Sequence, residues 1–113
     1  MALKKINTTH TQAWKKLEAH FESQKNVRLQ DAFQEEKDRF TNFSIHWEDF
    51  LVDFSKNRLS KETLNLLQEL ATECGLDEAI EAYFTGETIN ETEQRAVLHT
   101  ALRANENDQV FVD

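Results

Sequence analysis

The sequence predicts a mainly α fold, a small helical domain of about five helices with one short β-hairpin. In most segments the apolar residues recur three and four positions apart, which is the period of a helix with one buried face. A single stretch repeats its apolar residues every second position instead, which is typical of paired strands. With 113 residues, 2 glycines and no proline, the chain is long enough for one domain, and no part of it has the composition of an interdomain linker.

Two helices are expected before the period changes. The first is predicted from roughly Thr9 to Ser23, because its apolar residues follow the helical spacing. These residues are Trp14, Leu17 and Phe21. One of the polar residues at positions 7–9 is expected to cap this helix by accepting hydrogen bonds from its free amides. A shorter helix is predicted over Leu29–Lys37, where apolar and acidic residues lie on opposite sides.

Residues 39–54 predict a hairpin. Their apolar residues are Phe43, Ile45 and Trp47, followed by Phe50, Val52 and Phe54. The pair Glu48-Asp49 lies between the two runs, but neither residue adopts positive φ without cost, so a two-residue turn and a longer turn both remain open. Because a lone hairpin is not stable in water, we expect its aromatic face to pack on the helices.

Two further helices are marked by their ends. Ser60 is placed as an N-cap, Glu62 favours the positive end of the helix dipole, and Gly75 supplies a left-handed stop. The apolar stripe between them consists of Leu64, Leu67, Leu70, Ala71 and Cys74. The next helix begins at Asp77 and is followed by Gly86.

The last predicted helix begins at Asn90. Asn90 with Glu93 three residues later is a variant of the capping box. The apolar residues that follow are Val97, Leu98, Ala101 and Leu102. After this helix, Gln109–Asp113 has the composition of a strand without a partner, so we expect the sequence to be part of a longer polypeptide.

The charge balance argues against several classes of partner. The chain has 13 Lys and Arg against 21 Asp and Glu, which gives a formal net charge of -8. Phosphate backbones and anionic lipids repel an acidic chain, so neither nucleic acid nor a membrane surface is an expected partner. There is one cysteine and neither a signal-peptide core nor a long apolar run, so we expect a cytoplasmic location.

No residue pattern predicts a catalytic, cofactor or metal site in this chain. The four histidines show no paired spacing of the kind that zinc sites use, and the two glycines are isolated rather than part of a phosphate-binding loop. Cys74 is expected to be a small apolar residue of a helix rather than a nucleophile. Adjacent acidic residues such as Glu35 and Glu36 are better explained as solvated helix faces than as an acid/base pair.

Three cations stand out in this acidic chain. Arg95, His99 and Arg103 follow at spacing four, so on the predicted last helix they form one cationic ridge. The ridge suits a docking surface or an anion site. Local ion pairs, such as Glu91 with Arg95, explain the same residues without a partner, and all three interpretations remain open.

Four blocks of residues follow one another in a familiar order. They are Ala2–Asn7 with Trp14, Leu51–Leu59, Thr88–Arg103 and Val110–Asp113. The most specific are Val-Asp-Phe-Ser-Lys-Asn-Arg at 52–58 and Arg-Ala-Val-Leu-His-Thr-Ala-Leu-Arg at 95–103. Over essentially the whole chain, these blocks resemble the N-terminal region of the glucose-6-phosphate isomerase family, of the long bacterial and eukaryotic kind.

The resemblance implies a cytoplasmic, homodimeric enzyme that interconverts glucose 6-phosphate and fructose 6-phosphate through a cis-enediol, in glycolysis and gluconeogenesis, without metal or nucleotide. The catalytic groups and the sugar-phosphate loop of the family lie downstream of this region, so no catalytic residue is implied here and only the full enzyme would bind the sugar phosphate. Residues 1–113 would be a single helical lead-in to α/β sugar-isomerase domains that this chain does not contain, and would be inactive alone.

Under this resemblance, Arg95, His99 and Arg103 would fix the segment against the remainder of the isomerase chain and its homodimer mate through charge-assisted hydrogen bonds. The alternative is a free-standing helical module that binds a partner protein and has no enzymatic parent. A severed segment should expose a large apolar patch or bury it by self-association, whereas a free-standing module should not.

Overall fold

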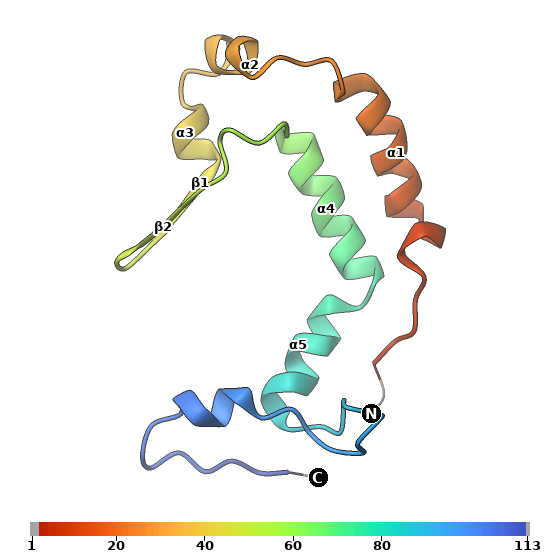
Figure 1. Cartoon of the computed structure of the whole chain (residues 1–113), viewed down its shortest axis with the longest axis vertical. Helices are drawn as coiled ribbons and strands as arrows, with labels where there is room; N and C mark the ends of the chain where they lie inside the picture. Colours follow the sequence, from red (N-terminus) through yellow and green to blue (C-terminus); the bar gives the residue numbers. More distant parts are fainter. Residues whose placement is uncertain (1–2, 113) are drawn as a thin grey trace.

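The computed structural model describes residues 3–112, which form an open arch of helices with a hairpin projecting from one limb (Figure 1). The elements are η1 (Thr8–His10), α1 (Gln12–Gln24), α2 (Leu29–Glu35), α3 (Arg39–Asn42), β1 (Ser44–Trp47), β2 (Phe50–Asp53), α4 (Lys61–Glu73), α5 (Leu76–Thr85) and η2 (His99–Arg103). Five α-helices and one hairpin confirm the predicted mainly α class. No helix among the described residues is long and apolar enough to cross a membrane.

The arch is much less compact than a globular domain of this size. Its extents are 52 × 38 × 17 Å and its radius of gyration is 18.8 Å, against about 13 Å for a compact chain of this length. Its accessible surface is 9185 Å², whereas a folded monomer of 13.2 kDa exposes about 6,400 Å². The arch therefore exposes much more surface than a compact domain of the same mass.

Helices α1 and α4 lie side by side and antiparallel, and they form the main helix–helix contact of the arch (Figure 1). Ala13 of α1 and Leu66 of α4 are buried. The carboxylate of Glu73, at the end of α4, accepts the backbone N–H groups of Gln12 and Ala13, each at 2.9 Å. Because the first amides of a helix have no partner within it, this carboxylate both caps α1 and joins the two helices.

The start of α1 differs from the prediction. The helix begins at Gln12, and its cap is Thr11, whose side chain accepts from the backbone N–H of Trp14. Asn7 caps the preceding turn η1 instead. The polar residues at positions 7–11 provide caps for two successive helix starts, that of η1 and that of α1. The spacing of apolar residues does not distinguish between these two starts. The predicted second helix is confirmed as α2, ending two residues early.

The hairpin is confirmed, and its turn is the short one. β1 pairs antiparallel with β2, from Ser44 opposite Asp53 to Trp47 opposite Phe50, and Glu48 in the turn has a φ of 49°. The expectation that its aromatic face packs on the helices is wrong, because the side chains along both strands are largely exposed. The short helix α3, which the sequence did not predict, leads into β1 and anchors the hairpin only at its base.

Helices α4 and α5 agree closely with the prediction. Ser60 caps α4 in a reciprocal capping box with Thr63. Gly75, with a φ of 77°, ends α4 and begins α5, and Gly86, with a φ of 80°, ends α5. Both glycines therefore lie in the left-handed region that other residues rarely adopt.

The predicted last helix, from Asn90 to Leu102, is wrong. Asn90 accepts the backbone N–H of Glu93, as a cap would, but the chain turns back and the backbones of Asn90 and Arg95 pair as an antiparallel bridge. Gln94 takes a φ of 55° to close this turn. Only the 3-10 turn η2 forms further on. The expected terminal strand is also absent from residues 109–112; residue 113, the end of that prediction, lies outside the described range.

Candidate functional site

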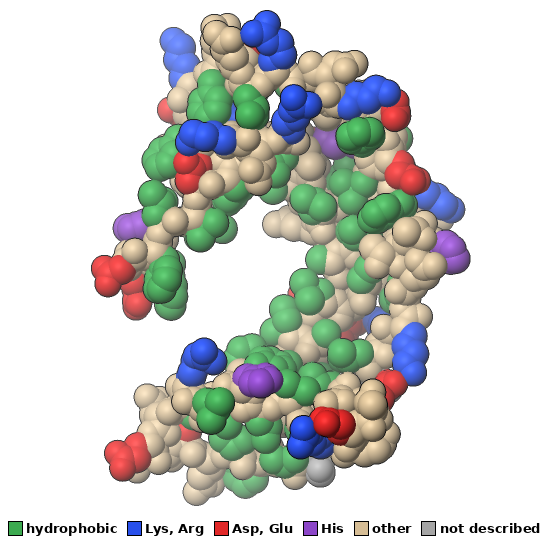
Figure 2. Space-filling view, in the orientation of Figure 1, with side chains coloured by type: hydrophobic (Ala, Val, Ile, Leu, Met, Phe, Trp, Pro, Cys, Tyr) green, Lys and Arg blue, Asp and Glu red, His purple; other side chains and the backbone are tan. Residues whose placement is uncertain are grey.

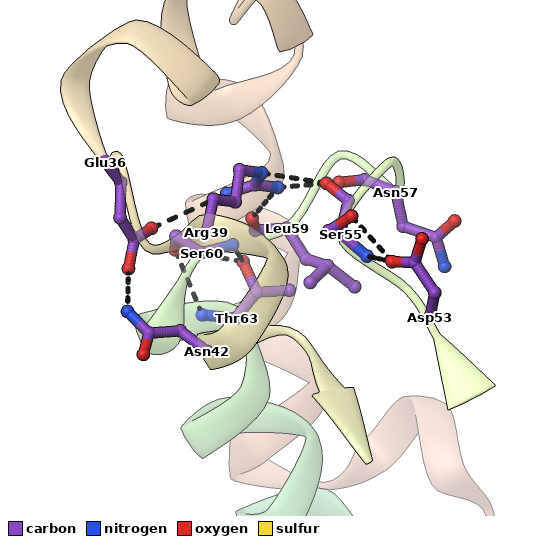
Figure 3. A network of polar contacts seen from close by, with 9 residues as sticks. All are labelled: Glu36, Arg39, Asn42, Asp53, Ser55, Asn57, Leu59, Ser60 and Thr63. Carbon is purple, nitrogen blue, oxygen red and sulfur yellow. Dashed lines mark hydrogen bonds and ion pairs between the residues drawn. The ribbon is translucent and has the colours of Figure 1, made fainter. Parts of the chain in front are cut away.

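The best-defined polar cluster of the arch surrounds Arg39, the first residue of α3 (Figure 3). Arg39 is 3% exposed. The guanidinium donates to three backbone carbonyl oxygens, of Ser55 at 2.8 Å and of Asn57 and Leu59 at 2.9 Å. Arginine has five N–H donors in a rigid fork, so one buried side chain can hold a whole loop. Arg39 thereby fixes the loop that joins the hairpin to α4.

Aromatic rings and one carboxylate complete the surroundings of Arg39. Its guanidinium carbon lies 4.5 Å from the ring centroid of Phe43, within the range of a cation–π contact. Glu36 is 3.8 Å away and also accepts from the amide of Asn42. With its donors satisfied by carbonyl dipoles and its charge balanced at one edge, the buried guanidinium is a structural clamp rather than an anion receptor.

Asp53 organises the start of the same loop. Its carboxylate accepts the hydroxyl of Ser55 at 2.6 Å and the backbone N–H of Ser55 at 2.9 Å, and it pairs with Lys56 at 3.1 Å. The hydrogen bonds from Ser55 and the ammonium of Lys56 lower the pKa of Asp53 from 3.8 to about 2. A carboxylate held this acidic accepts no proton near neutral pH, so it is suited to holding a turn and not to acting as a general base.

A carboxylate, an imidazole and a hydroxyl meet where α1 approaches the start of α4. The Nε2 atom of buried His20 lies 2.7 Å from Oγ1 of Thr63, and its Nδ1 atom lies 3.6 Å from Glu62. The order of carboxylate, imidazole and hydroxyl resembles that of a hydrolytic triad. However, Oγ1 of Thr63 also accepts the backbone N–H of Ser60 and contacts the hydroxyl of Ser60. The hydroxyl is therefore engaged in capping α4, and the cluster joins two helices rather than activating a nucleophile.

An open hollow of about 710 Å³ adjoins this cluster. Its walls include Trp14, Leu17 and Phe21 of α1, and Arg58 reaches its edge from the loop. Figure 2 shows further hydrophobic side chains along the inner edge of the arch. Apolar surface on this scale is typical of faces that meet another protein surface.

The structure does not bring the three predicted ridge residues onto one helix. Arg95 lies at the bridge with Asn90 and pairs with Glu93 at 2.6 Å, while His99 and Arg103 belong to η2. The expected local pair of Glu91 with Arg95 is replaced, because Glu91 pairs with Lys5 at 2.7 Å. All three ridge residues are exposed. They remain near one another in sequence but do not form the helical ridge predicted for them.

Among residues 3–112, no three His, Cys, Asp or Glu side chains are grouped as metal ligands would be. Cys74 is half-buried at the end of α4, with its sulfur 3.9 Å from Oγ1 of Thr8.

Arg39 was not identified from the sequence. Its hydrogen-bond partners are backbone carbonyls, which leave no trace in residue types, and Glu36, three residues earlier, has the spacing of an ordinary local ion pair. Residues 52–58 include most of the loop that Arg39 holds, but their residue types do not show that a buried guanidinium binds their backbone.

Comparison with known proteins gives a consistent result. Residues 53–113 match the family model for phosphoglucose isomerase. The chain is 52% identical over 110 residues to a glucose-6-phosphate isomerase of Christiangramia forsetii, covering 97% of this chain. It is 51% identical over 112 residues to the glucose-6-phosphate isomerase of Buchnera aphidicola subsp. Cinara cedri, covering 98% of this chain. It spans 20% of the length of each relative. The chain therefore belongs to the phosphoglucose isomerase family.

Proposed function

We propose that this chain is the N-terminal portion of a glucose-6-phosphate isomerase, which interconverts glucose 6-phosphate and fructose 6-phosphate as a cytoplasmic homodimer. The observation that carries the proposal is identity above 50% along nearly the whole chain to proteins of that name, of which it spans one fifth. The other four fifths of such an enzyme would supply the sugar-isomerase domains and the sugar-phosphate site.

We further propose that residues 1–113 alone are a scaffold without isomerase activity. Proton transfer through a cis-enediol needs a base whose pKa is close to the working pH, held in a cleft. Among residues 3–112, the carboxylates whose pKa is clearly altered are Asp53, Glu73 and Glu78. In each, the pKa is lowered by hydrogen bonds that hold a turn, a helix start or Lys4. This direction is opposite to the one that such a base requires.

Arg95, His99 and Arg103 retain their proposed role as contacts to the remainder of the enzyme or to its homodimer mate. Each is exposed and lies on the segment between α5 and residue 104. Exposed guanidinium groups make charge-assisted hydrogen bonds to carboxylates readily, and this needs no common helix face.

The proposal is tested with a full-length chimera. The 113 residues replace the corresponding region of the Christiangramia forsetii isomerase, and a coupled assay measures turnover of fructose 6-phosphate by the chimera and by the 113 residues alone. We expect an active chimera and an inactive isolated chain. Turnover by the isolated chain, lost on joint substitution of Arg95 and His99, would refute the scaffold role.

An inactive chimera together with an isolated chain that sediments as a compact monomer would instead indicate the free-standing interaction module. The unsubstituted Christiangramia forsetii enzyme, carried through the same purification, is the control for the assay.

A further inference from the structure

The hairpin has two chemically different faces. In an antiparallel pair, residues opposite one another share a face, and successive pairs alternate between faces. The pairs Ile45 with Val52 and Trp47 with Phe50 therefore place four apolar side chains on one face. The pairs Ser44 with Asp53 and His46 with Leu51 occupy the other, which is polar except for Leu51. We call the first of these the apolar hairpin face.

The apolar hairpin face is open to solvent. Its four residues are 56–64% exposed, and the rings of Trp47 and Phe50 stack on each other with their centroids 5.8 Å apart. Alternating apolar and polar residues are typical of a strand with one buried face. Within residues 3–112 no helix covers this face, so its sequence pattern is that of a buried surface and its environment is that of an exposed one.

The base of the hairpin is held firmly, which distinguishes it from a loose loop. Phe43, just before β1, is buried and meets the ring of Phe54 edge to face at 6.1 Å, and the backbone N–H of Phe54 donates to the carbonyl of Phe43. Arg39 clamps the loop that follows β2. A surface held in shape before it binds loses less conformational entropy on docking than a flexible one.

The charges around the face argue against a second copy as its occupant. The tip carries Glu48 and Asp49, and the chain has a formal net charge of -8. Two copies meeting face to face would bring these acidic tips and two strongly acidic chains together. An apolar patch edged by lysine or arginine suits the face, because it would bury the rings and pair with the tip.

We infer that the apolar hairpin face docks onto the remainder of the isomerase polypeptide, on an apolar patch with cationic residues opposite Glu48 and Asp49. This rests on the proposed function, in which the other four fifths of the enzyme provide that surface. The hairpin is then an arm that joins the helical arch to the sugar-isomerase domains.

Two neighbouring residues provide a matched test. Val52 and Leu51 are each 56% exposed but lie on opposite faces of the hairpin. Val52→Cys and Leu51→Cys are made separately in the isolated chain and in the full-length chimera. Each is treated with a small alkylating reagent, and modification of the hairpin peptide is followed by mass spectrometry. In the isolated chain, both cysteines should react at similar rates.

In the chimera, the cysteine at 52 should react about tenfold or more slowly than in the isolated chain, while the cysteine at 51 changes much less. Equal rates at the two positions in an active chimera would overturn the inference and leave the proposed function intact. An inactive chimera would overturn the proposed function and this partner with it.

A second copy as the occupant gives a different result. Protection of position 52 in the isolated chain that increases with protein concentration, together with dimerisation in sedimentation, would assign the apolar hairpin face to self-association and would also overturn the inference.

Discussion

The Nε atom of Arg39 donates to the carbonyl oxygen of Ser55 across 2.8 Å, although the two residues are 16 positions apart and both are buried. Between them the chain forms the whole hairpin and returns. The contact therefore joins the start of α3 to the loop after β2 and sets the direction in which the hairpin leaves the arch.

Replacing Arg39 should strongly destabilise the chain. Arg39→Ala leaves the carbonyl oxygens of Ser55 and Leu59 without a donor and removes one of the two donors to the carbonyl oxygen of Asn57. We expect the free energy of unfolding to fall by about 3 kcal/mol. Urea unfolding followed by circular dichroism measures it. Arg28→Lys, at an exposed arginine, is the control and should change stability by less than about 0.5 kcal/mol. Equal effects of the two substitutions would contradict the clamp.

Asp53 should contribute to stability only above acidic pH. Because its pKa is lowered from 3.8 to about 2 in the folded chain, its contribution is complete above pH 4 and is lost as pH falls toward 2. Asp53→Asn keeps an oxygen that accepts from Ser55 but cannot titrate. The difference in urea midpoint between the wild-type chain and this variant should therefore shrink between pH 4 and pH 2. A difference that stays constant across this range would contradict the lowered pKa.

The hydroxyl group of Thr63 should contribute to the stability of the chain. Thr63→Val keeps the shape of the side chain but removes the partner of His20 and of the Ser60 backbone N–H. We expect stability to fall by about 2 kcal/mol. Thr63→Ser restores the hydroxyl and should cost less than about 1 kcal/mol. A loss in Thr63→Ser as large as that in Thr63→Val would show that the methyl group contributes as much as the hydroxyl, and would contradict this prediction.

The two glycines should differ in their tolerance of alanine. Both have positive φ, so alanine costs about 1 kcal/mol at either position. At Gly86, however, a Cβ atom would lie 2.5 Å from the carbonyl oxygen of Phe111, whereas at Gly75 it would meet the flexible side chain of Lys4 at 3.0 Å. Gly86→Ala should therefore cost about 2 kcal/mol or more.

Gly86→Ala should also displace the final segment, because the backbone at Phe111 must move. Limited proteolysis near residues 109–112 should be faster in this variant than in the wild-type chain, and unchanged in Gly75→Ala. Equal cleavage in all three proteins would show that the close approach at Gly86 is relieved elsewhere.

Local signals predicted the parts of the fold that local chemistry determines. Ser60 and Gly75 bound α4 as expected, because a hydroxyl cap and a left-handed glycine act within a few residues. The hairpin register follows from the period of two and the short turn at Glu48. The family resemblance, which rested on runs of identical residues, was likewise confirmed.

The last helix was wrongly predicted because the capping pattern at its expected start is compatible with both a helix and a turn. Asn90 accepting the N–H of Glu93 begins a helix or closes a turn with the same hydrogen bond. The choice depends on Gln94, which takes positive φ, and on the surroundings of the segment, where Leu98 lies beside Gly86 and Glu91 reaches Lys5. These are tertiary contacts, and the spacing of Arg95, His99 and Arg103 does not encode them.

The hairpin face was mispredicted for a similar reason. Its alternation is typical of a strand with one covered face, but the sequence does not say which body would cover it. We expected the helices of the arch to cover it, but Arg39 directs the hairpin away from them.

The arch is only 17 Å thick and has almost no interior. Its stability therefore depends on polar contacts where the chain bends, such as those of Arg39 with its loop and of Glu73 with the start of α1. In the isolated chain we therefore expect the reverse of the usual pattern, in which apolar core residues tolerate substitution least. Hydrophilic substitutions along the exposed sides of the helices should have little effect on stability, whereas single substitutions at these few charged contacts should unfold the arch.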